Sequence, residues 1–245
     1  MPPLIIAHRG DSAHRPENTF ASFMSAFEVG AQLVEFDVQL TRDGHVVVIH
    51  DHTVDRTTNG HGDVREMTLA EIRALSAGYP SRFGGDWAGE RVPTLQETLA
   101  FLRGRARAMI EIKKDSVTGD GAGGVEARTV AEVRRQGMEK EVAFLSFDSR
   151  ALLRCREQAP EIARGQLFYR EDLDRVFLAA QTIAAEIVMP EKGMLSPQLR
   201  ERARETGIKV GTWVVDDPAE LKALESLDLF GVGTNCPGVL IEALL

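Results

Sequence analysis

The sequence predicts an α/β fold, a (β/α)8 or TIM barrel of parallel strands surrounded by helices, and three observations support it. Short apolar runs rich in valine and isoleucine alternate with longer amphipathic segments along the chain. Eight of these runs recur in strand–helix order, and such crossovers between parallel strands are right-handed. The length of 245 residues is typical of such a barrel. An open, doubly wound sheet is the alternative, because it uses the same strand–helix order.

Nine apolar runs are the expected strands. In chain order they are Leu4–His8, Leu33–Val38, Val46–His50, Ala108–Ile112, Val142–Ser146, Ile162–Leu167, Glu186–Met189, Lys209–Val214 and Leu229–Thr234. The third run follows the second too closely for a crossover helix, so these two runs are expected to form a hairpin outside the eight-strand repeat.

The turn of this hairpin is the segment Thr41–Gly44, which reads Thr-Arg-Asp-Gly. Aspartate followed by glycine is a strong hairpin signal, because both residues accept a positive φ. With the turn centred on this pair, the numbers of facing residues sum to about 87. His50 is therefore expected to lie opposite Asp37.

Helix boundaries are marked between the strands. Asn18 is expected to cap a helix with an apolar face of phenylalanine and methionine that closes at Gly30. Further helix signals are a capping box at Thr94–Glu97, proline after Ser196 and after Asp217, and an amphipathic stretch from Val125 to Gly137.

The chain is expected to form a single domain over residues 1–245, with residues 51–92 as a small insertion at the barrel rim. The inserted segment is rich in glycine and charged residues and holds one short helix signal, Thr68–Glu71. It is therefore not expected to form an independent core.

Charge and cysteine content argue against several classes of protein. The chain has 37 acidic and 29 basic residues, a net charge of −8, which disfavours a nucleic-acid partner. Its two cysteines, Cys155 and Cys236, are too few for a disulfide-stapled secreted scaffold. No apolar run approaches the roughly 20 residues of a membrane span, and the first residues lack a signal-peptide pattern. A cytoplasmic protein is expected, and no feature indicates an oligomeric state.

Two of the six histidines end apolar runs. His8 and His50 occupy these positions, and the carboxyl ends of barrel strands are where catalytic side chains gather. The remaining histidines are expected in exposed loops: His14, His45, His52 and His61. His8 and His50 are therefore the candidate catalytic histidines.

Three carboxylates are expected near these histidines. Glu35 and Asp37 are two positions apart on one strand, so their side chains point to the same side, and Glu111 lies on the next parallel strand. Like charges this close require a compensating cation or base. Three carboxylates without a thiolate suit a hard divalent ion such as Mg²⁺ or Ca²⁺, and zinc with histidine ligands is the alternative.

Two basic side chains adjoin these groups. Arg9 offers a forked donor for phosphate oxygens, and Lys113 offers a point charge. For Arg9, the alternative is an ordinary ion pair with Glu17 or Asp11. Trp213 also ends a strand, and either belongs to the core or lines the wall of a pocket.

Seven motifs follow one another between residue 8 and about residue 237. They are His8–Gly10, Pro16–Thr19, Glu35 with Asp37, Thr41–Gly44, His50–Asp51, Glu111–Lys113 and the segment around Trp213. This ordered set resembles the glycerophosphodiester phosphodiesterase family. The chain departs from the family at one place, because Thr234–Pro237 reads Thr-Asn-Cys-Pro where many members have Thr-Asp-Tyr-Pro.

The resemblance implies a barrel with a small insertion after the second catalytic histidine. It assigns acid–base catalysis to His8 and His50, metal binding to Glu35, Asp37 and Glu111, and substrate binding to Arg9, Lys113 and Trp213. The implied reaction is the metal-dependent hydrolysis of a small-molecule glycerophosphodiester to sn-glycerol 3-phosphate and an alcohol.

Two other functions are compatible with these residues. One is a lyase or hydrolase of lysophospholipid head groups, similar to phospholipase D-type toxins, although such proteins are secreted and disulfide-bearing. The other is a non-catalytic barrel that binds a metal or an anion. The glycine-rich run over residues 119–124 is interpreted either as a mobile lid over the substrate or as a loop without function.

Overall fold

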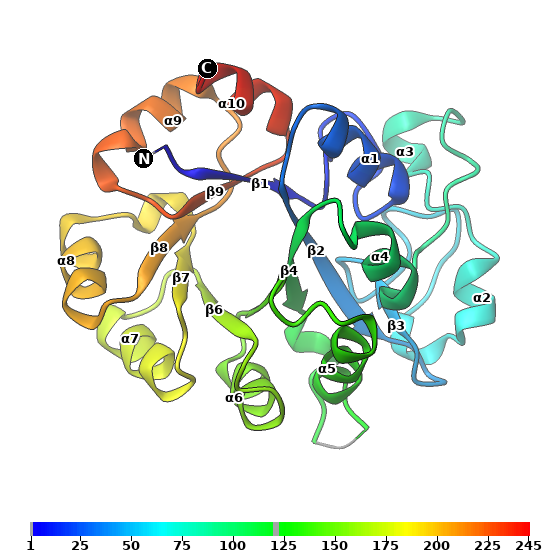
Figure 1. Ribbon diagram of the computed structural model, residues 1–245. Helices are drawn as coiled ribbons and strands as arrows, with labels where there is room; N and C mark the ends of the chain where they lie inside the picture. Colours follow the sequence, from blue (N-terminus) through cyan, green and yellow to red (C-terminus); the bar gives the residue numbers. More distant parts are fainter. Residues whose placement is uncertain (1, 120–122) are drawn as a thin grey trace.

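The computed structural model describes residues 2–119 and 123–245, and Figure 1 shows a closed barrel ringed by helices. The strands are β1 (Leu4–His8), β2 (Leu33–Leu40), β3 (Val46–Val48), β4 (Arg107–Ile112), β5 (Val142–Ser146), β6 (Ala163–Phe168), β7 (Ile187–Pro190), β8 (Lys209–Thr212) and β9 (Gly231–Thr234). Their order is β1-β9-β8-β7-β6-β5-β4-β2-β3, and a further pairing of β1 with β2 closes the barrel. The predicted (β/α)8 barrel is therefore confirmed, and the open sheet is excluded.

The helices are α1 (Phe20–Glu28), α2 (Leu69–Arg73), α3 (Pro80–Phe83), α4 (Leu95–Leu102), α5 (Val125–Gln136), α6 (Ser149–Gln158), α7 (Leu173–Thr182), α8 (Pro197–Thr206), α9 (Pro218–Leu224) and α10 (Pro237–Ala243). Short 3₁₀ turns lie at η1 (Val64–Glu66), η2 (Lys114–Ser116), η3 (Lys192–Met194) and η4 (Glu225–Leu227). In the described part of the chain, no helix has the length and apolar character to cross a membrane.

Most helix boundaries follow the capping signals in the sequence. The Thr94 capping box begins α4, proline opens both α8 and α9, and Gly137 ends α5 in the left-handed conformation. The assignment of Asn18 as a cap is wrong. Thr19 caps α1, because it has the extended backbone that a cap needs, whereas Asn18 has φ +60°.

The predicted hairpin forms between β2 and β3, but its register differs from the prediction by one residue. Ile49 takes the place expected for His50, and its N–H donates to the carbonyl of Asp37 at 3.1 Å. The Thr41 N–H bonds to the His45 carbonyl at 2.9 Å, which closes a three-residue loop where a two-residue turn was expected. One additional loop residue changes which residues face each other.

The apolar side chains form two layers separated by the barrel wall. The larger layer packs the helices against the outside of the sheet and includes Phe23, Phe36 and Phe144, all fully buried. A second cluster fills the barrel interior, with Ile6, Leu33, Met109, Leu145, Leu167, Ile187 and Met189. Beyond this plug, at the carboxyl ends of β1, β2 and β4, lie the polar side chains His8, Glu35, Asp37 and Glu111.

Residues 51–92 lie at the side of the barrel, where α2 and α3 are drawn at the right of Figure 1, outside the strands. A small apolar cluster lies beneath this insertion and uses side chains from both it and the hairpin: Val47, Ile49, Val54, Val64, Ile72, Ala77 and Val92. The insertion is therefore anchored to the barrel through β3. The proposed lid over residues 119–124 falls largely on residues 120–122, which lie outside the described residues.

Candidate active site

Four of the candidate site residues are strand side chains that point into the barrel beyond the apolar plug. The interior sequence runs from apolar to polar along three neighbouring strands: Ile6 then His8 in β1, Leu33 then Glu35 and Asp37 in β2, and Met109 then Glu111 in β4. Since β1, β2 and β4 are neighbouring parallel strands, these polar ends come together at one rim.

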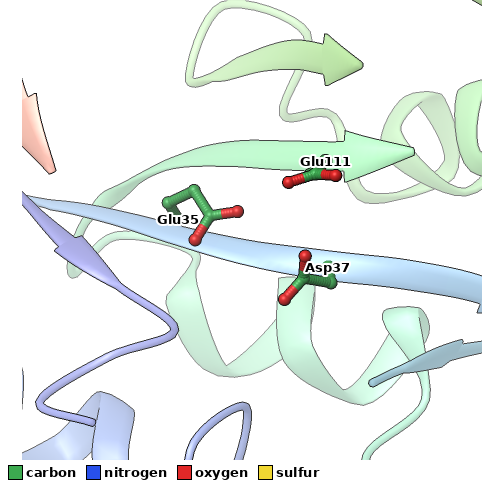
Figure 2. A group of neighbouring side chains, drawn as sticks. All are labelled: Glu35, Asp37 and Glu111. Carbon is green, nitrogen blue, oxygen red and sulfur yellow. The ribbon is translucent and has the colours of Figure 1, made fainter. Parts of the chain in front are cut away.

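Glu35, Asp37 and Glu111 form an acidic triad, as Figure 2 shows. Each offers a carboxylate oxygen within 4.8 Å of the other two, and all three side chains are buried. Lys113 pairs with Glu111 at 2.7 Å and with Asp37 at 3.4 Å. Arg9 approaches Asp37 at 3.2 Å, so two cations adjoin three acids.

Burial and mutual repulsion control ionisation within the acidic triad. Burial raises the pKa of Glu111 to about 7, and the charge of Asp37 adds to this. The pKa of Glu35 is raised well above its ordinary value for the same two reasons. Burial also opposes ionisation of Asp37, but Arg9 and Lys113 outweigh it and lower the pKa of that carboxyl. Asp37 is therefore the permanently charged member of the triad.

The acidic triad fits a hard divalent cation. Its donors are all carboxylate oxygens, which Mg²⁺ and Ca²⁺ prefer. The Asp37 Oδ1 atom is buried and accepts no hydrogen bond, and the Lys113 ammonium at 3.4 Å is its ionic partner, so it has lone pairs to offer a cation. An ion bound there would also relieve the repulsion that raises the pKa values of Glu35 and Glu111.

His8 is held by a partner from the far end of the chain. Its Nδ1 lies 2.7 Å from Asn235 Oδ1, just beyond β9. The Asn235 Nδ2 donates to Asp216 at 2.8 Å, which leaves Oδ1 as the acceptor and places the proton on His8 Nδ1. The Nε2 atom is then free to accept a proton. Desolvation, and then the charge of Arg9, lowers the pKa of His8 to about 4, so the ring is neutral at pH 7.

His50 lies two residues beyond the end of β3. The Gln39 side-chain amide donates to the carbonyls of His50, at 2.9 Å, and Asp51, which fixes this turn of backbone. The Nδ1 of His50 lies 2.6 Å from Asp51 Oδ1, and a carboxylate can only accept, so Nε2 is again the free nitrogen. Desolvation lowers the pKa of His50, while Asp37 and Asp51 partly oppose this effect.

These side chains surround a cavity of about 160 Å³ at the mouth of the barrel. Its polar wall is formed by His8, Arg9, Glu35, His50, Glu111 and Lys113, and its apolar wall by Ile6, Leu145, Phe147, Leu167, Met189, Trp213 and Gly233. The cavity contains every predicted site residue except Asp37, which is fully buried. A larger groove of about 880 Å³, lined in part by Leu4 and Phe230, contains none of the candidates.

Trp213 lies one residue past the end of β8 and forms part of the apolar wall. Its ring nitrogen donates to the Met189 carbonyl at 3.0 Å, and its ring meets Phe147 edge-to-face at 5.6 Å. The ring also packs against the apolar cluster of the barrel interior, so Trp213 combines the two roles considered, core and pocket wall.

The ion pair of Arg9 with Glu17, considered as an alternative from the sequence, is present at 2.9 Å, and Arg9 pairs with Asp37 as well.

Several residues that support the site were not identified from the sequence. Asn18 donates to Asp37 at 2.9 Å. The other supporting residues are Gln39, Arg56, Asp216 and Asn235. The only sequence signal for any of them is a motif position, because their contacts join segments far apart in the chain.

Comparison with known proteins agrees with this geometry. The model of the glycerophosphoryl diester phosphodiesterase family matches residues 8–239. A glycerophosphodiester phosphodiesterase from Caldanaerobacter subterraneus subsp. tengcongensis is 39% identical over 99% of this chain and 98% of its own length. A Bacillus subtilis protein of the same name is 30% identical over 96% of this chain and 84% of its own length.

Solved structures are similar over the whole barrel. A glycerophosphodiester phosphodiesterase from Agrobacterium tumefaciens superposes with a TM-score of 0.84 at 32% identity and covers 100% of both chains. An Oleispira antarctica phosphodiesterase, solved in complex with the product sn-glycerol-3-phosphate, gives a TM-score of 0.86 at 28% identity. That comparison covers 99% of this chain and 97% of the other.

Proposed function

The chain belongs to the glycerophosphoryl diester phosphodiesterase family and is a phosphodiesterase, and on that premise we propose that it hydrolyses glycerophosphodiesters to sn-glycerol 3-phosphate and an alcohol. The observation that carries this proposal is the pair of histidines, His8 and His50, which line one small cavity with the acidic triad. The product complex of the Oleispira antarctica relative supports glycerol phosphate as the product.

We assign a divalent cation, Mg²⁺ or Ca²⁺, to Glu35, Asp37 and Glu111. When bound, such an ion polarises a phosphoryl oxygen and offsets the charge that develops on it. The triad is buried and rigidly placed on two paired strands, so little reorganisation is needed to bind the ion.

Arg9 and Lys113 are proposed to hold the non-bridging phosphate oxygens. Both side chains line the cavity, and both are oriented by ion pairs with Asp37. Because these pairs form before substrate arrives, the two cations are already in place when charge develops on the phosphate.

His8 is proposed as the general base and His50 as the general acid. His8 is neutral and has only an uncharged amide, Asn235, on its Nδ1, so its Nε2 is ready to take the proton of the attacking hydroxyl. His50 has the Asp51 carboxylate, which stabilises an imidazolium. When His50 is protonated at both ring nitrogens, its Nε2 proton passes to the departing alkoxide as the phosphorus–oxygen bond to the alcohol breaks, and the neutral ring keeps its Nδ1 proton.

The attacking hydroxyl is either the 2-hydroxyl of the substrate's glycerol or a water molecule. The first route forms a cyclic phosphate that water then opens, and the second gives the products directly. The same two histidines serve either route, since each needs one proton removed and one supplied.

Turnover of glycerophosphocholine and glycerophosphoethanolamine tests the proposal. Metal is stripped from the protein and then restored, and wild type is compared with His8→Ala and with His61→Ala, an exposed histidine of the insertion that serves as a control. We expect metal-dependent release of glycerol phosphate, lowered by roughly 10²–10⁴-fold in His8→Ala only.

Two outcomes would contradict the proposal. Turnover of lysophospholipids without turnover of the water-soluble diesters would favour the head-group lyase. Metal binding without turnover of any diester would favour a non-catalytic binding barrel.

We also propose that the protein acts in the cytoplasm, which fractionation of cells that produce it would check.

A further inference from the structure

Arg56 belongs to the rim insertion, yet its guanidinium makes two forked ion pairs at the edge of the active site. Its Nη1 and Nη2 donate to the two carboxylate oxygens of Glu17 at 2.7 and 2.8 Å. Its Nε and Nη2 donate to the two oxygens of Asp51 at 2.7 and 3.0 Å. Every nitrogen of the guanidinium is therefore used.

Each of these carboxylates also contacts a residue of the proposed machinery. Glu17 accepts a hydrogen bond from Arg9 Nη1 at 2.9 Å, and Asp51 is bonded to His50 Nδ1 at 2.6 Å. The five side chains form a continuous chain from Arg9 through Glu17, Arg56 and Asp51 to His50. A single carboxylate, Glu17, therefore separates Arg56 from Arg9, and a single carboxylate, Asp51, separates it from His50.

Tyr79 fixes the position of Arg56 from the other side. Its ring centre lies 5.4 Å from the guanidinium carbon, and its hydroxyl accepts from Nη1 at 3.3 Å. Tyr79 stands at the start of α3, so the insertion provides both the arginine and its support. The side chain of Arg56 is 35% exposed, whereas that of Glu17 is only 8% exposed.

We propose that Arg56 is a positioning residue, which sets the placement of His50 relative to Arg9 around the phosphate. Holding Arg56 in this position is then a function of the rim insertion. Only a planar, forked group can satisfy two carboxylates in this way, because a lysine ammonium offers a single point charge. The inference rests on the proposed function, since it takes the roles of His50 and Arg9 from there.

Kinetics of Arg56→Met and Arg56→Lys test the inference. Arg134→Met is the matched control, because Arg134 also pairs with a carboxylate through two nitrogens, which both donate to Glu161 Oε1 on the exposed outside of the barrel. We expect kcat to fall by about 10–100-fold in both Arg56 variants, as for other groups that orient catalytic residues. Added guanidinium ion should restore part of the kcat of Arg56→Met, and Arg134→Met should keep the wild-type kcat.

A second measurement is independent of turnover. In protein labelled with ¹⁵N-histidine, the His50 signal is assigned by its loss in His50→Ala. At a pH high enough to deprotonate the imidazolium of His50, we expect wild type to show the neutral form protonated at Nδ1. Arg56→Met should then show a mixture of the two neutral forms, because Asp51 has lost two of its bonds. Arg134→Met should match wild type.

Wild-type kcat in Arg56→Met, or in Arg56→Lys should the methionine variant not fold, would overturn the inference. An unchanged His50 signal in the Arg56 variant would overturn it as well. The signal distinguishes this result from failure of the proposed function, since it reports the placement of His50 even in a protein that hydrolyses no diester.

Discussion

Protons and the divalent cation are expected to compete for the acidic triad. The test is to titrate metal-free protein with Mg²⁺ or Ca²⁺ at about pH 7.5 and again at about pH 5.5. Only ionised carboxylates bind such ions, so affinity falls as the carboxyls take up protons. The direction follows from the raised pKa values of Glu35 and Glu111.

The size of the loss in metal affinity can be worked out from Glu111, whose pKa of about 7 results first from burial and then from the charge of Asp37. At that pKa, the carboxyl is ionised in about three quarters of molecules at the higher pH and in about 3% at the lower. This carboxyl alone therefore weakens binding by about 25-fold. Glu35 titrates in the same direction, so the observed loss should be at least that large.

Isothermal titration calorimetry gives both the affinity and, in buffers of different ionisation enthalpy, the number of protons released. We expect at least about one proton per bound ion near pH 6. Glu111→Gln, which carries no proton to displace, should bind more weakly at the higher pH and show a shallower pH dependence. Equal wild-type affinity at both pH values, with no proton release, would show that the triad is not the ion's site.

Three further predictions concern catalysis, the fold and the thiols. His50→Ala should lose far more activity on an alkyl diester than on a p-nitrophenyl diester, because a good leaving group needs no general acid; equal losses would assign the acid role elsewhere. Gly10→Ala should lower the free energy of unfolding in urea by about 2–4 kcal/mol, since Gly10 has φ +83° and a Cβ there would lie 2.6 Å from the Ser22 backbone. Cys155, whose pKa is raised to about 12 by burial, should react with Ellman's reagent only after unfolding, and rapid reaction of the native thiol would contradict its burial.

The barrel and the candidate residues at its strand ends could be predicted from the sequence, because they depend on the local pattern of apolar and polar residues. Apolar runs of four to six residues mark the strands, and the two-residue period of a strand puts Glu35 and Asp37 on one side. The position of His50 was harder, because the register of its hairpin depends on whether the turn has two or three loop residues. A sequence that reads Asp-Gly is compatible with both.

The supporting residues could not be predicted from such patterns. Asn235 reaches His8 from 227 positions away, and Arg56 meets Glu17 across 39 positions. Such contacts depend on how loops from different strands fold over the rim. The capping propensity of Asn18 gave the wrong role for the same reason, since its side-chain amide donates to Asp37 of β2.

The pairing of β1 with β9, together with the contact from His8 to Asn235, has a consequence for synthesis of the protein. Asn235 follows His8 by 227 positions, so His8 is synthesised long before the residue that orients its ring. A nascent chain that stops before β9 lacks the strand between β1 and β8, and its barrel is open. If His8 is the general base, as proposed, such a chain should hydrolyse no diester until β9 and Asn235 have been added.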